Sequence, residues 1–154
     1  MNKFSIALAA AALIGSVGAA HAVDAKAKFN GNVAHSCTLL AGTDGTLVPN
    51  FDGDVLSSKL TGGAAATVTA TTTAGPYKVS ALAPVAFTLG SSTNTTFEAS
   101  YSISGATTAS NVAGATVTKV KRGTNNISVD LVATNSLDAF ANGSYAAEVT
   151  VRCE

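Results

Sequence analysis

The sequence predicts an all-β protein, a single β-sandwich, and two observations lead to this prediction. Apolar and polar residues alternate along most of the chain, and no useful length places apolar residues at i, i+3, i+4 and i+7. Gly, Asn, Asp and Ser gather between the alternating runs, which follow one another at intervals of about ten residues. Short strands joined by turns have this pattern.

The alternation predicts strands near residues 25–38, 46–51, 65–72, 77–82, 85–89, 96–103, 115–121, 127–133 and 144–152. In the first of these, one face is apolar and the intervening positions are charged or polar; the apolar face consists of Ala25, Ala27, Phe29, Gly31 and Val33. In the last strand, Tyr145, Ala147, Val149 and Val151 share a face. No linker or repeat interrupts the series, so residues 23–154 are predicted to form one domain.

Residues 1–22 have the pattern of a secretory signal peptide. Lys3 gives the positive start, residues 6–14 are almost continuously apolar, and Ala20-His21-Ala22 is a small-x-small cleavage site. The apolar run is shorter than the roughly 20 residues of a membrane span, which disfavours a retained anchor. We therefore expect a secreted, periplasmic or cell-surface protein.

The composition excludes some classes of function. Only 12% of the residues are charged, with nine Lys and Arg against nine Asp and Glu, so the basic excess that nucleic-acid binding needs is missing. Much of the apolar content is Ala, which predicts a thin core that needs a further source of stability.

The two cysteines offer that source. In an oxidising compartment an even number of cysteines predicts a disulfide, and the alternation turns both Cys37 and Cys153 toward the core. A bond between them would close a loop worth roughly 4 to 5 kcal/mol. Intermolecular pairing is the alternative.

No residue pattern predicts catalysis, a cofactor or a metal centre. His35 is the only histidine after the leader. The sequence contains no nucleophile elbow and no pattern that gives His35 a carboxylate partner, so a structural role is favoured. Asn50, Asp52 and Asp54 have the start of a calcium-loop spacing but lack its later positions, so a hairpin turn at Asp52-Gly53 is favoured. The basic cluster near residues 119–122 indicates a solvated strand end. We predict that the protein is not an enzyme.

Three segments resemble pilins of chaperone-usher systems and the related spore-coat-protein-U-like secreted subunits. Residues 29–37, FNGNVAHSC, are similar to the first strand of fimbrial subunits; residues 66–79 resemble their second strand and the turn after it, and residues 143–151 their last strand. The chain differs from these families at Thr71 and Thr72, where a second Cys is usual, and at Cys153, where an aromatic residue is usual.

The resemblance implies an immunoglobulin-like, pilin-like sandwich that lacks one strand and receives it from the next subunit. Ala25, Ala27, Phe29, Gly31 and Val33 would then be the face of a donated strand. The implied function is a structural subunit of a surface filament such as a fimbria, or of an extracellular matrix, with a role in cell adhesion. The partners would be copies of itself or related subunits, with a periplasmic chaperone as a further candidate. Neither a nucleic-acid partner nor a membrane span is expected.

Two alternatives are left open by the residues themselves. Residues 25–34 are equally compatible with an ordinary first strand that pairs within its own chain. The function could also be that of a monomeric secreted ligand-binding or carbohydrate-binding sandwich. Against the carbohydrate alternative, the sequence contains no Trp that could stack on a sugar ring.

Overall fold

The structure is a computed structural model that describes residues 23–75 and 77–154. The predicted signal peptide, residues 1–22, lies outside the described residues. The chain divides into two units between Asn32 and Val33. The described residues contain no helix that is long and apolar enough to cross a membrane.

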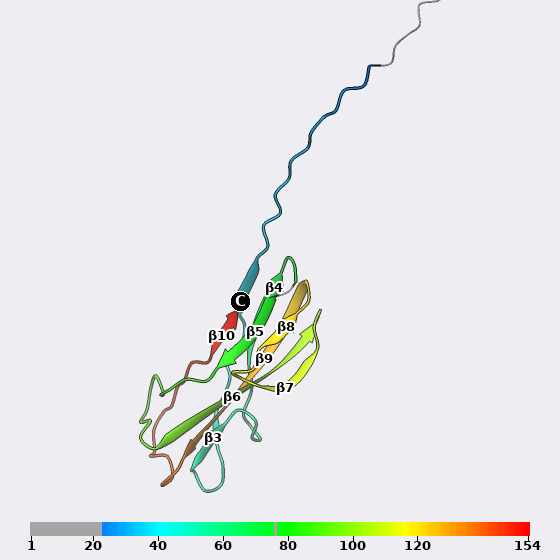
Figure 1. Ribbon diagram of the computed structural model, residues 1–154. Coiled ribbons are helices and arrows are strands. Elements are labelled where there is room, and N and C mark those ends of the chain that lie inside the picture. Colours follow the sequence, from blue (N-terminus) through cyan, green and yellow to red (C-terminus); the bar gives the residue numbers. More distant parts are fainter. Residues whose placement is uncertain (1–22, 76) are drawn as a thin grey trace, which may run out of the picture. The chain divides into compact units, whose positions relative to one another are not determined.

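The described part of the second unit is all-β and contains ten strands, which form two antiparallel sheets (Figure 1). This confirms the predicted fold class. The strands are β1 (Cys37–Ala41), β2 (Val48–Pro49), β3 (Val55–Ser57), β4 (Ala66–Thr72), β5 (Tyr77–Leu82), β6 (Thr95–Gly105), β7 (Ala109–Ala113), β8 (Thr118–Val120), β9 (Gly123–Asn135) and β10 (Thr150–Cys153).

The larger sheet is built around β9, which pairs with β6 along almost its whole length. Strand β7 extends the sheet beyond β6. On the other edge of β9, β4 pairs with the first half and β3 with the last residues, and β1 and β2 continue outward from β4 and β3. The smaller sheet has the order β10-β5-β8.

The core between the sheets consists of two clusters. The first contains Val79 from the smaller sheet and Ile127 from the larger one, both almost completely buried, together with Tyr101. The Tyr101 hydroxyl lies 2.9 Å from the Val79 carbonyl oxygen and 2.7 Å from the Thr118 hydroxyl, so its burial leaves no polar atom unsatisfied. The second cluster, around Leu56 and Phe87, lies toward the other end of the sandwich.

A disulfide joins Cys37, the first residue of β1, to Cys153, the last residue of β10, and this confirms the predicted bond. The two Cα atoms are 6.4 Å apart and the sequence separation is 116 residues. Because β1 belongs to the larger sheet and β10 to the smaller one, the bond fastens the two sheets together at one end of their edges. We call this end of the domain the disulfide end.

Several predicted strands differ from the observed ones. Residues 25–36 were expected to be strand, but they form none, and the first strand begins at Cys37. Residues 85–89 form no strand either, apart from one bridge between Leu89 and Ala146. Conversely, β3 and β7 were not predicted. The predicted strands at 65–72, 77–82, 96–103 and 127–133 are confirmed within a few residues, whereas those at 46–51, 115–121 and 144–152 are only partly formed.

We predict that replacing both cysteines by alanine lowers the free energy of unfolding by about 5 kcal/mol, because the bond restricts a loop of 116 residues in the unfolded chain. Urea unfolding of the oxidised protein and of the double variant measures the difference. The protein with its disulfide reduced should unfold at the same urea concentration as the double variant. A loss of unfolding free energy below about 1 kcal/mol in the variant would contradict the prediction.

Candidate functional site

An open groove of about 1110 Å³ lies against the larger sheet, beside β10 and the segment before it. One wall is the end of β1 and the loop that leads to β2, and the other is the segment 140–151 before and within β10. Apolar side chains from the core strands line its floor: Leu56, Val68, Val129 and Leu131. The floor of the groove is therefore apolar, whereas polar and charged residues such as Asp44, Asn50 and Glu148 also line it.

The strands that border the groove each have one unpaired edge. Among the described residues, β1 pairs only with β4, and β10 pairs only with β5. An unpaired edge presents a row of backbone N–H and C=O groups that can bind another strand. The groove includes one residue of each of these strands, Ala41 of β1 and Val151 of β10.

The C-terminal wall turns its apolar face toward the sandwich, as the alternation predicts. Tyr145, Ala147, Val149 and Val151 are half-buried, whereas Ala146, Glu148, Thr150 and Arg152 are exposed. All four half-buried residues line the groove. Their incomplete burial shows that this face has apolar area left for a further side-chain layer.

The far end of the groove, away from the disulfide, is closed by aromatic side chains. The Phe87 ring lies 4.8 Å from Phe97, 5.8 Å from Phe140 and 5.0 Å from Tyr145, measured between ring centroids, with edge-to-face geometry. Such pairs stabilise beyond their buried area. They hold the segment 140–147, whose one strand-like contact is the bridge at Ala146, against the larger sheet.

The predicted donor residues lie in the segment before β1. Ala25, Ala27, Phe29 and Gly31 belong to the first unit and Val33 begins the second. None of them is in a strand, and the Phe29 and Val33 side chains are 94% and 79% exposed. This segment therefore keeps an alternating apolar face that no strand pairing covers.

The other candidate residues form no second centre. His35 is exposed. The Asn50 amide donates to Asp54 over 2.7 Å, and Gly53 adopts the positive φ of 77° that the turn between β2 and β3 requires, which confirms the hairpin interpretation. The described residues hold no group of three or more His, Cys, Asp or Glu suited to a metal ion.

A shallower hollow lies on the outer face of the larger sheet, over β4, β9 and β6. Its polar lining comes mainly from hydroxyl and amide side chains, among them Thr67, Thr69, Ser102, Ser104, Asn126 and Ser128. No charged side chain lines it. The side chains around this hollow are uncharged, and it is distinct from the groove.

The groove itself was not predicted from the residues alone, because it depends on which strand edges remain unpaired. The resemblance to pilins was the signal that pointed to it. No family model, curated protein or solved structure matches this chain. The groove, its free edges and the disulfide are therefore the features from which a function can be inferred.

We predict that Phe87→Ala lowers the free energy of unfolding by about 3 to 5 kcal/mol, because it removes the centre of the aromatic cluster. Hydrogen exchange of the amides in residues 140–149 should also become faster. Phe51→Ala is the matched control, since the Phe51 side chain is fully exposed and its loss should change stability by less than about 0.5 kcal/mol. Equal effects of the two variants would contradict the prediction.

Proposed function

We propose that this protein is an exported structural subunit of a surface filament or extracellular matrix, and that its copies join by donating the segment 23–36 to the groove of a neighbouring copy. The observation that supports this most is the combination, in one chain, of an open groove between two unpaired strand edges and an alternating segment that forms no strand. The immunoglobulin-like, pilin-like topology is part of the same proposal.

The lengths of the two elements are compatible. The apolar face from Ala25 to Val33 covers nine residues, or about 30 Å when extended at roughly 3.3 Å per residue. The groove wall from Tyr145 to Val151 covers seven residues, or about 23 Å on the same basis. The donated face is therefore long enough to follow the wall from end to end.

The chemistry of the two elements is also compatible. The backbone of an inserted strand would pair with the free edge of β10, and its alternate side chains would point to the apolar floor. Phe29 is the largest side chain on the donated face, and its burial alone contributes about 1.5 to 3 kcal/mol. Lys26, Lys28, Asn30 and Asn32, on the opposite face, would stay in water.

The export step is supported by the sequence of the leader and by the disulfide. An intrachain disulfide forms and persists in an oxidising compartment such as the periplasm or the extracellular space. A groove with two free strand edges would also bind other extended chains before assembly, so a periplasmic chaperone is part of the proposal as a partner.

The decisive variant is Phe29→Asp in the mature chain, residues 23–154. We expect it to weaken association between copies at least about a hundredfold, because a carboxylate replaces the main apolar anchor. Asn30→Asp introduces the same residue on the opposite face and should assemble as the unaltered protein does. Light scattering and non-reducing gels measure the chain length. A monomeric mass for the unaltered protein, with no ladder of larger species, would refute assembly by strand exchange.

Electron microscopy of the cell surface provides the corresponding test in the producing organism. We expect filaments or matrix when the full chain is exported, and their loss when residues 23–34 are deleted. Unaltered surface structures in the deletion strain, with the protein still exported, would contradict the proposal.

A further inference from the structure

The basic side chains of the second unit are concentrated at one end, and three of its eight acidic residues, Asp52, Asp54 and Asp138, lie at the other. Residues 33–154 contain six Lys and Arg, and all except Lys59 lie at the disulfide end: Lys78, Lys119, Lys121, Arg122 and Arg152. All five are exposed. Lys78 and Lys119 stand directly opposite each other on β5 and β8, and the acidic residue Glu154 pairs through its backbone with Lys78. We call this group of five cations the basic end.

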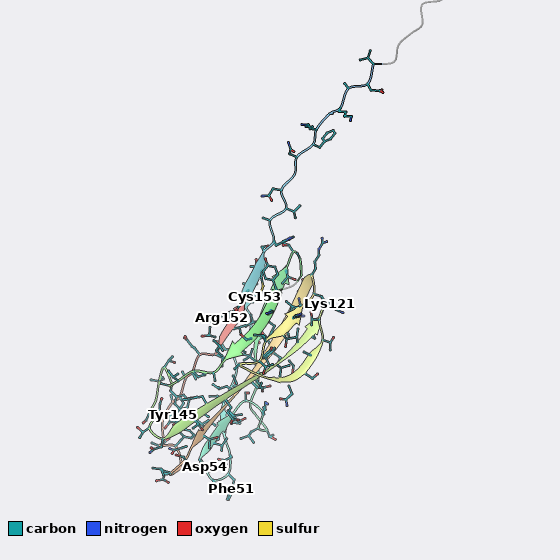
Figure 2. All side chains as sticks on the ribbon, in the orientation of Figure 1. Phe51, Asp54, Lys121, Tyr145, Arg152 and Cys153 are labelled. Carbon is teal, nitrogen blue, oxygen red and sulfur yellow. A yellow bond between two sulfur atoms is a disulfide. The ribbon has the colours of Figure 1, made fainter. Side chains whose placement is uncertain are left out.

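The opposite end of the unit is acidic. It is formed by the turn 50–54 and the loop 135–140, which lie side by side because the Phe140 N–H donates to the Gly53 carbonyl. Asp52, Asp54 and Asp138 belong to these loops, together with the exposed side chains of Phe51 and Leu137, which are 103% and 76% exposed. We call these five residues the acidic tip. Figure 2 shows Lys121 and Arg152 near Cys153 at one end, and Phe51 and Asp54 at the other.

The backbone at both ends is held in place by hydrogen bonds. At the basic end the Lys121 N–H donates to the Thr107 hydroxyl over 2.7 Å, and the Thr72 hydroxyl donates to the Lys121 carbonyl. The buried Asn125 amide links the same loops through Thr107. At the acidic tip the Asn135 N–H donates to the Asp54 carbonyl over 2.8 Å. The backbone that carries the charged residues is therefore held in place at each end, which favours specific contact.

A second copy of this chain fits the acidic tip, because the complementary surface is the basic end of the same chain. Two acidic tips repel each other, as do two basic ends, so a contact between unlike ends is the one that charge favours. Such a contact uses two different surfaces and leaves one of each free, which is the condition for an open filament. Phe51 and Leu137 add apolar area at the centre of the acidic tip.

We propose that consecutive copies meet end to end, with the acidic tip of one copy against the basic end of the next. This contact adds to the strand exchange of the proposed function. It rests on that function, because strand exchange is what brings together the two copies that the contact joins. It gives the filament a direction and accelerates the encounter that precedes strand insertion.

The same contact determines the direction of the inserted strand. The donated segment leads into Cys37 at the basic end of its own copy, and β10 runs from the acidic tip side toward Cys153. A segment inserted antiparallel to β10 ends beside the acidic tip of the acceptor and brings the donor's basic end to it. Parallel insertion would bring the donor's basic end to the acceptor's basic end. The charges therefore select antiparallel insertion.

Charge reversal at each end tests the contact in the mature chain. The tip variant is Asp52→Lys with Asp138→Lys, the base variant is Lys121→Glu with Arg122→Glu, and the control is Lys59→Glu with Glu98→Lys, which changes two charges away from both ends. At low salt we expect each end variant alone to assemble at least about tenfold more slowly than the unaltered protein. An equimolar mixture of the two end variants should assemble faster than either variant alone, since the unaltered acidic tip of the base variant then meets the unaltered basic end of the tip variant. The control should assemble normally.

Salt and a second background complete the test. The differences should disappear at high salt, where the screening length falls from about 30 Å at 0.01 M to about 8 Å at 0.15 M. The end variants made in the Phe29→Asp chain, which cannot exchange strands, allow the end contact to be measured alone by sedimentation at low salt. In this background the mixture of end variants should associate more strongly than either variant. Equal rates for all variants, or a mixture no faster than its components, would overturn the end contact. If the unaltered protein forms no chains but the sedimentation result holds, strand exchange fails and the end contact stands.

Discussion

The backbone of an edge strand must find hydrogen-bond partners or stay in water, and this requirement governs the architecture of the protein. Strands β1 and β10 stand at neighbouring edges of the two sheets, and among the described residues each pairs on one side only. The disulfide draws these edges together at Cys37 and Cys153, but it acts at one end. Away from this bond the groove is bordered by Ala41 and the loop after it on one side and by the segment 140–151 on the other.

The distribution of large side chains follows the same division. The cluster near the disulfide is filled by Val79, Tyr101 and Ile127, which are almost fully buried, so the sheets are tightly packed there. Toward the acidic tip the packing depends on the aromatic group around Phe87 and on the segment 140–147. The half-buried Val149 and Val151 pack against the first cluster. A strand in the groove would complete their burial and join the two clusters into one continuous core.

Strands whose side chains alternate between core and solvent could be predicted from the sequence. Features that depend on how distant strands pair could not. Residues 77–82 are a strand as predicted because alternate side chains enter the core, but the equally alternating residues 85–89 leave Val85 exposed while Phe87 turns into the aromatic cluster. Strand β3 is three residues long and lies in a Gly- and Ser-rich context, so no period could be seen. The segment 25–36 has the alternation of a strand, and alternation alone does not say whether a partner is present. Likewise Lys78 and Lys119 are far apart in the sequence, and only the pairing of β5 with β8 brings their charges together.

The position of the disulfide has a mechanical consequence for a chain of such subunits. Tension would enter one copy through the strand held along β10 and leave it through the segment that precedes Cys37. The sulfur bridge connects these two points directly, so the pulling force passes from the last strand to the first through covalent bonds. The 115 residues between the two cysteines, counted from the separation of 116, lie outside this path and would bear only the load that passes through side-chain contacts in the groove. A subunit linked in this way would yield at the joints between copies before its own sheets unfold.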